Sequence, residues 1–390
     1  MRREQVADFK QCQALFRSAH DLLAAGDYPA ALQVATDAQA VAARLVARDP
    51  GLRLVAAMAD NVLGCALHRV GRTREGLDRL AAAEVTLRAT GKHGKLPKPS
   101  RLVLIEVLSN RAGCCGSIGL YEDAIRSGAE ALALMADPVP RTDLARRELA
   151  SAMLNHGANL FRVGELADGL RLTDGALRVY RSMRQPLPDD VARCLSNRAA
   201  ILDIAGRYPD AVTATQDALA AIQDAIAIRR AVGGERPVEL ALSLVNQADC
   251  LDRLDRPAEA VDAAAEAVEI LRAQLDRNPN GHAADLAQAL TGHAAALRRT
   301  GRTDAALAAA SEAYTALLRL AEAEPSAHRD DLAYTTRVLA EVLESLGRTT
   351  EARQFGDAAV AQYQPLAAAW PGRYQRLLDE ARAVRARLDA

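Results

Sequence analysis

Hydrophobic and small residues recur along the chain in intervals of 42 to 49 residues. Each interval contains two stretches in which apolar residues return every three or four positions, which predicts two amphipathic helices. A short turn separates the two stretches. The turns centre on Gly26, Gly71, Gly119, Gly164, Gly206, Asp255, Gly301 and Gly347. The pattern predicts an all-α chain of about eight helix pairs.

Small residues occupy three equivalent positions in every pair. Seven positions before the turn residue, and five and twelve positions after it, all eight pairs carry Ala or Gly. Around Gly71, for example, these residues are Gly64, Gly76 and Ala83. Small side chains at such places let neighbouring helices pack closely. We therefore expect a bulky substitution there to cost a few kcal/mol by overpacking.

Segments rich in Pro, Gly and Asn separate the pairs and set their boundaries. We place the pairs at residues 4–48, 51–90, 100–136, 142–184, 188–232, 237–276, 282–323 and 326–369. Residues 371–389 carry one more helical pattern without a second turn, which predicts a capping helix. No shift in composition divides the chain, so we expect a single solenoid domain over residues 1–390.

The pattern resembles the tetratricopeptide repeat (TPR) superfamily, in which small residues surround the turn of each helix pair. The resemblance extends from about Phe9 to Leu366, with intervals longer than the usual ~34 residues. These long repeats are similar to the kinesin-light-chain type, a form also found in bacterial multi-repeat proteins. The resemblance implies a right-handed superhelical solenoid that holds a protein or an extended peptide in its concave groove.

Composition and charge exclude several classes of partner. The chain has 49 basic and 50 acidic residues, a net charge of −1, and thus no strong field for nucleic acid or anionic membranes. No apolar stretch is long enough to span a membrane, and residues 1–5 do not begin a signal peptide. We expect a cytoplasmic protein that binds neither nucleic acid nor membrane.

Catalytic and metal-binding motifs are absent from the sequence. The six cysteines form no C-x-x-C pair, and the seven histidines are scattered without metal-ligand spacing. No nucleophile elbow or dinucleotide-binding fingerprint occurs. We therefore expect no metal, no cofactor and no enzymatic activity. The lysine-rich segment 91–101 is either a solvated loop or a contact site for an anion.

Four asparagines occupy one position, nine residues before the turn, in four successive pairs. They are Asn110, Asn155, Asn197 and Asn246. The TPR resemblance implies that this position faces the concave groove, where an amide can donate to and accept from a peptide backbone. The alternative is that each asparagine only ties neighbouring helices together.

Charged residues near this row change sign along the chain. The fifth and sixth pairs supply Asp203, Asp249 and Asp252, whereas other pairs supply Arg69, Arg162, Arg298 and Arg299. One hypothesis is that the aspartates receive a basic element of a partner and the arginines an acidic one. The other is that all seven are ordinary solvated charges.

Three functions agree with this sequence. The first is a scaffold or adaptor that binds a protein or peptide in its groove. The second is a peptide-sensing regulatory module of bacterial signalling or defence; no effector segment precedes the first pair, so we expect its effector to be encoded separately. The third is a homodimer through the terminal repeats, with Phe9, Leu15 and Phe16 as an apolar patch.

Overall fold

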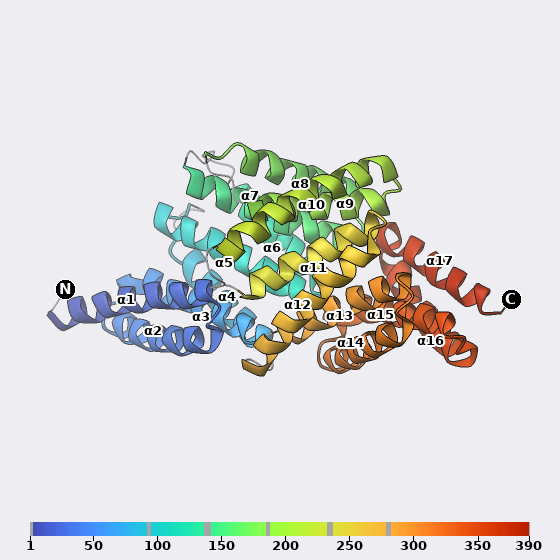
Figure 1. The fold of residues 1–390 in the computed structure, drawn as a ribbon. Coiled ribbons are helices and arrows are strands. Elements are labelled where there is room, and N and C mark those ends of the chain that lie inside the picture. Colours follow the sequence, from blue (N-terminus) through green and yellow to red (C-terminus); the bar gives the residue numbers. More distant parts are fainter. Residues whose placement is uncertain are drawn as a thin grey trace. The chain divides into compact units, whose positions relative to one another are not determined.

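The computed structural model describes residues 3–91, 95–135, 142–184, 188–231, 237–277 and 282–389. The chain divides into two compact units, Met1–Arg141 (unit 1) and Thr142–Ala390 (unit 2). In the described residues the regular elements are seventeen α-helices and one short 3-10 helix, with no β-strand. The predicted all-α architecture of stacked helix pairs is confirmed (Figure 1). A single continuous solenoid stays a prediction.

Unit 1 contains three helix pairs. Its helices are α1 (Arg3–Ala25), α2 (Tyr28–Arg48), α3 (Arg53–Arg69), α4 (Thr73–Arg88), α5 (Lys98–Ser117) and α6 (Tyr121–Met135), with the 3-10 helix at Pro50–Leu52. The first helices of successive pairs also contact each other, α1 with α3 and α3 with α5. Two buried clusters form its core, one around Leu45 and one around Leu104.

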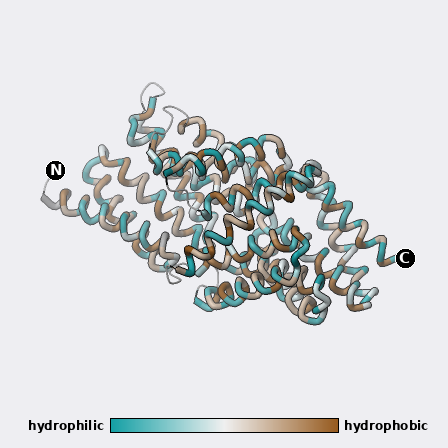
Figure 2. The backbone as a smooth tube through the Cα atoms, turned by 45° about the horizontal axis from the view of Figure 1, so that its top comes forward, coloured by the Kyte–Doolittle hydropathy of each residue, from teal (hydrophilic) through white to brown (hydrophobic). Residues whose placement is uncertain are grey.

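Unit 2 contains five pairs and a final single helix. Its helices are α7 (Asp143–Arg162), α8 (Leu166–Arg181), α9 (Pro188–Ile204), α10 (Tyr208–Ala231), α11 (Pro237–Arg253), α12 (Pro257–Arg277), α13 (Ala283–Arg299), α14 (Thr303–Ala323), α15 (Pro325–Ser345), α16 (Thr349–Ala369) and α17 (Pro371–Arg387). The first helices α7, α9, α11, α13 and α15 contact one another in succession, and α17 packs mainly on α16. Apolar and polar segments alternate along the helices (Figure 2).

The predicted turn residue has a positive φ angle in all eight pairs. At Gly164, φ is 85°, and the N–H of Glu165 donates to the carbonyl of Leu160 one turn back. This is the left-handed helix ending that glycine adopts without steric cost. Asp255 takes the same conformation with φ 58°, and aspartate is among the few other residues that tolerate it.

The small residues of each pair lie where its two helices cross. In the second pair a Cβ atom added at Gly76 would lie 2.6 Å from the carbonyl oxygen of Gly64, and one added at Gly64 would lie 2.9 Å from that of Gly76. The fourth pair has the same arrangement at Gly157 and Gly169. These two pairs therefore approach too closely to accept even a methyl group without movement.

We expect Gly76→Ala to lower the free energy of unfolding by about 1–3 kcal/mol, because its methyl group would push α3 and α4 apart. Gly113 provides the control, because a Cβ there meets no atom within 4 Å. Gly113→Ala should raise stability by about 0.5–1 kcal/mol through helix propensity alone. Urea unfolding followed by circular dichroism measures both. Equal effects of the two substitutions would contradict close packing at Gly76.

Candidate functional site

The first helices of unit 2 surround a polar chamber of about 560 Å³. Its lining residues come from α7, α9, α11, α13 and α15, with further contributions from α12, α16 and α17. The helix α17, which the sequence predicts only as a cap, supplies Arg373, Arg376 and Glu380 to the lining. The chamber is thus formed between the inner layer of helices and the end of the chain.

Four of the predicted groove residues line this chamber. They are Asn246, Asp203, Asp249 and Asp252. The predicted residues Asn155, Asn197, Arg162, Arg298 and Arg299 belong to unit 2 but are not among its lining residues. Asn155 is exposed and Asn197 is half-buried. The row of asparagines therefore brings one amide, that of Asn246, to the chamber.

Asn110 and Arg69 belong to unit 1. The Asn110 side-chain amide donates to the Oδ1 atom of Asn61 at 3.0 Å and so links α5 to α3. The Arg69 guanidinium lies 5.8 Å from the centre of the Tyr28 ring. At Asn110 the geometry therefore matches the alternative in which the asparagine ties neighbouring helices together.

The three chamber aspartates are already paired with arginines of the same chain. Arg253 donates to Asp249 at 2.9 Å and to Asp203 at 3.4 Å, and Arg376 donates to Asp203 at 2.7 Å. Asp252 accepts from Arg299 at 2.5 Å. The Asp249 carboxylate raises the pKa of Arg253 further above its usual value. Each of these aspartates forms an ion pair with an arginine of the same chain, and the Asp249 side chain is still 59% exposed.

The predicted arginines are also engaged. Arg299 contacts Asp255 as well as Asp252. Arg298 lies 3.0 Å from Glu341. A partner's acidic element would have to compete with these intramolecular pairs.

The fold matches solved structures, although no family model and no curated protein matches the sequence. The apo form of the quorum sensor NprR from B. thuringiensis aligns with a TM-score of 0.59 at 16% identity, over 93% of this chain and 89% of that one. A Rap protein complexed with Competence and Sporulation Factor aligns with a TM-score of 0.54 at 14% identity, over 97% and 99%.

This chain has the tetratricopeptide-repeat fold. The helix pairs, the left-handed turns and the small residues at each crossing agree with that assignment. The kinesin-light-chain type of its long TPR repeats stays a prediction.

Several residues that line the chamber of unit 2 were not predicted from the sequence. Asp330, Asp331, Tyr334 and Arg337 come from α15, and Arg373 and Arg376 come from α17. A signal for the second group exists, because Arg373, Arg376, Leu377 and Glu380 are spaced to share one helix face. A helix that seals the end of a solenoid also needs a polar outer face, so this spacing does not by itself separate the two roles.

Asp331 differs from the other chamber aspartates. In the described residues no arginine, lysine or histidine forms an ion pair with it, and its side chain remains accessible to solvent. Although its surface is open to solvent, the helices around the chamber desolvate the Asp331 carboxyl and raise its pKa to about 7, and the carboxylate of Asp330 acts in the same direction. The arginines Arg162 and Arg373 oppose this shift.

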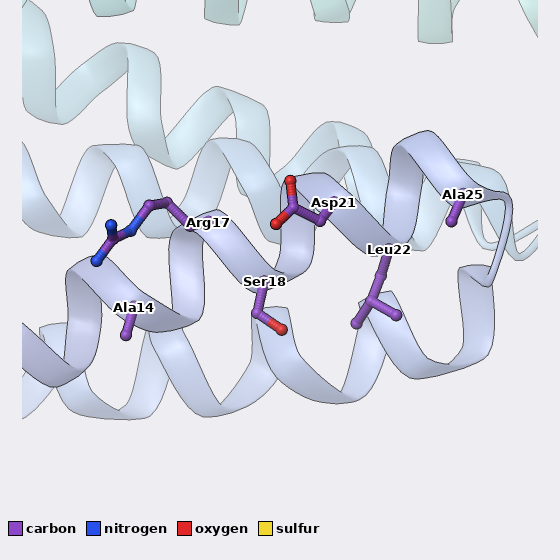
Figure 3. Close-up of a pocket in the computed structure, with 6 residues that line it drawn as sticks. All are labelled: Ala14, Arg17, Ser18, Asp21, Leu22 and Ala25. Atoms are coloured by element: carbon purple, nitrogen blue, oxygen red, sulfur yellow. The ribbon is translucent and has the colours of Figure 1, made fainter.

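A second depression lies on α1 in unit 1 (Figure 3). All its lining residues, among them Arg17, Ser18 and Asp21, come from this one helix. In the close-up Arg17 and Asp21 point away from Ser18 and Leu22, and no second element supplies an opposite wall. The depression is an open helix face and has none of the convergent polar groups of the chamber in unit 2.

The predicted apolar patch near the N-terminus packs inward. Phe16 is only 8% exposed, and Phe9 and Leu15 pack against the same buried cluster of unit 1. These three side chains therefore form no exposed patch. Homodimerisation through the terminal repeats stays a prediction without that support.

Other predicted features are placed as follows. In the described part of the chain no three His, Cys, Asp or Glu residues are arranged to hold a metal ion. The cysteines are free, and burial raises the pKa of Cys12 to about 11. No described helix has the length and apolar character to cross a membrane. Residues 92–94 of the lysine-rich segment lie outside the described residues, and its end, from Lys98, belongs to α5.

The raised pKa of Asp331 predicts a pH-dependent stability. Between pH 3.8 and about pH 7 the folded chain retains a proton that the unfolded chain has released, so the free energy of unfolding falls as the pH rises. Asp331→Asn should remove this contribution and stabilise the chain more at about pH 8 than at about pH 5. We expect a small effect, because the side chain is exposed to solvent.

Thermal unfolding followed by circular dichroism at the two pH values measures this difference. The control is Asp262→Asn, which changes an exposed aspartate on α12 outside the chamber. An identical response of both variants to pH would show that Asp331 does not carry the effect.

Proposed function

We propose that the chain is a binding scaffold and that the chamber of unit 2 holds a short peptide or an extended segment of a protein. The observation that carries this proposal is the polar chamber enclosed by the first helices, with Asn246 and a set of fixed charges in its walls. Its volume of about 560 Å³ lies within the range of ~300–1,000 Å³ typical of ligand pockets.

The similarity to the Rap protein supports this proposal. That protein was solved in complex with Competence and Sporulation Factor, so this fold is compatible with holding such a factor. In the chamber the Asn246 amide offers both donor and acceptor groups. These suit a peptide backbone, which presents donors and acceptors at regular spacing.

The charge of the chamber favours a cationic ligand. Six carboxylates line it, Asp203, Asp249, Asp252, Asp330, Asp331 and Glu380, against four arginines, Arg253, Arg337, Arg373 and Arg376. In the part of the chain that the structure describes, Arg373 forms its ion pair with Asp330 rather than with Asp331. We therefore propose that an amino terminus, lysine or arginine of the ligand binds at Asp331, beside the partly exposed Tyr334.

A regulatory module that controls a separately encoded effector is the second candidate. The similarity to NprR, which is described as a quorum sensor, favours it. Such a module needs a part of the protein that changes between two arrangements when the ligand binds.

Selection from a displayed library of short random peptides tests the binding proposal. We expect enriched peptides to carry a basic residue. Asn246→Ala should weaken their binding about fivefold to tenfold through loss of one hydrogen-bonding amide. Asn155→Ala is the matched control, because it removes an asparagine from the same repeat position outside the chamber.

Isothermal titration calorimetry with an enriched peptide measures these affinities. Circular dichroism of both variants verifies that each retains its helices. Equal affinities of the parent and Asn246→Ala, or enrichment of acidic peptides, would contradict binding in this chamber.

Binding of a basic peptide should also depend on pH. The cation prefers the ionised carboxylate of Asp331, so affinity should rise as the pH increases through about 7. Titrations at about pH 5.5 and about pH 8 with parent and Asp331→Asn measure this dependence. The variant should lose both the dependence and about tenfold in affinity at the higher pH. A pH dependence that persists in Asp331→Asn would assign it to another group.

A further inference from the structure

The first two turns of α17 reach across unit 2 to its first repeats. Arg376 donates to Asp203 of α9 at 2.7 Å, although the two residues are 173 positions apart in the chain. In repeat solenoids each repeat normally contacts only its neighbours. This contact therefore connects two parts of the array that stacking alone does not bring together.

A second contact lies at Arg373, one turn earlier in α17. Its guanidinium lies 4.5 Å from the centre of the Phe161 ring on α7 and donates to Asp330 on α15 at 3.1 Å. Asp330 also accepts from the Tyr374 hydroxyl at 3.1 Å. Arg373 thus links α7, in the first helix pair of unit 2, to α15, in its last pair.

The third contact is between two glycines. A Cβ atom added at Gly372 would lie 2.8 Å from the carbonyl oxygen of Gly164, the residue at the turn between α7 and α8. One added at Gly164 would lie 3.3 Å from the Cα atom of Gly372. The start of α17 therefore touches this turn backbone to backbone, and only residues without a side chain allow it.

The apolar face of α17, which includes Tyr374 within these first two turns, packs on α16 instead. Tyr374, Leu378 and Ala381 are buried in a cluster with Tyr363 and Leu366 of α16. The contact at Asp203 and Arg376 is by contrast polar and partly open, with side-chain exposures of 28% and 32%. Helix α17 can lose its contacts with α7 and α9 while its apolar face stays packed.

We propose that Gly372, Arg373 and Arg376 form a strap that holds the chamber closed, and that a ligand enters and leaves when the strap is released. The entry step rests on the proposed function of the chamber, whereas the strap itself does not. Arg373 and Arg376 of the strap line the chamber, as does Asp203, to which Arg376 donates. A ligand that contacts these residues therefore acts directly on the closure and selects one of two arrangements of unit 2.

The strap can be tested without a ligand. Spin labels at Asp168→Cys on α8 and Asp379→Cys on α17 report the distance across the closure. Both sites are exposed, Asp168 pairs with Arg171 of α8, and Asp379 pairs with Gln375 and Arg382 of α17. Labelled parent without the two new cysteines measures the background from native cysteines, most of which are buried. In the chain that carries both labels, double electron–electron resonance should give one narrow distribution of the distance between positions 168 and 379.

Two substitutions should widen this distribution towards longer distances. Gly372→Ala introduces a methyl group against the Gly164 carbonyl while favouring the helix, and Gly113→Ala in unit 1 is its control. Asp203→Arg places a third guanidinium group beside Arg253 and Arg376, and adding Arg376→Asp should narrow the distribution again in part, because the contact with Arg253 stays repulsive. A distribution that is broad in the parent, or unchanged in both variants, would overturn the strap.

Ligand exchange is then tested with a basic peptide enriched from the displayed library. Stopped-flow fluorescence should show that Gly372→Ala increases the dissociation rate about threefold to tenfold relative to Gly113→Ala. A bismaleimide that joins cysteines at 168 and 379 should slow association by a similar factor or more.

The two proposals fail in different ways. If no peptide is enriched, the proposed function fails while the distance measurement still decides the strap. If peptides bind and their rates are unchanged in both Gly372→Ala and the cross-linked chain, the strap does not control access and the inference is wrong.

Discussion

The whole structure depends on the close approach of two helix backbones beside each left-handed turn. The turn reverses the chain in very few residues, and the small residue on either side of it must then face the partner helix. At Gly64 and Gly76 the approach is so close that each Cβ position falls against the other residue's carbonyl oxygen. Elsewhere alanines such as Ala112 and Ala124 fill the same place and are buried. Leucines can occupy the surrounding positions because they fill the grooves between helices, whereas the crossing itself has no space for them.

This constraint explains why so much of the fold could be predicted from the sequence. The turn and the crossing each demand a residue type, and the demands recur at fixed distances, so all eight turn residues were found, including Asp255. Prediction from repeated spacing does not detect contacts that occur outside the repeat pattern. The contact between Gly372 and Gly164 is not part of the repeat pattern, so no periodic signal in the sequence marks it. For this reason α17 could be predicted as a helix but not as a wall of the chamber.

The prediction of the site was limited by a similar cause. Positions counted from the turn led to Asn246, Asp203, Asp249 and Asp252, but the same positions also led to Asn155 and Asn197, which do not line the chamber. Asp330 and Asp331 lie near the start of α15, far from its turn, where the repeats differ and no equivalent positions can be compared. The pairing of Asp203 with Arg376 depends on how far unit 2 curves. Curvature sums small rotations between repeats of unequal length, and these cannot be derived from spacing.

The chemistry of the closure decides which part of unit 2 can move. An ion pair with the partial exposure of Asp203 and Arg376 contributes about 0.2–1 kcal/mol, and a cation over an aromatic ring, as at Arg373 and Phe161, about 0.5–2 kcal/mol. Burial of a tyrosine or leucine such as Tyr374 or Leu378 contributes roughly 1.5–3 kcal/mol for each side chain, and several such residues hold α17 on α16. The joint between α17 and the first repeats is therefore weaker than the joint between α17 and α16. It also coincides with the wall of the chamber, so a ligand with its own cation can compete for the carboxylates on which the closure depends.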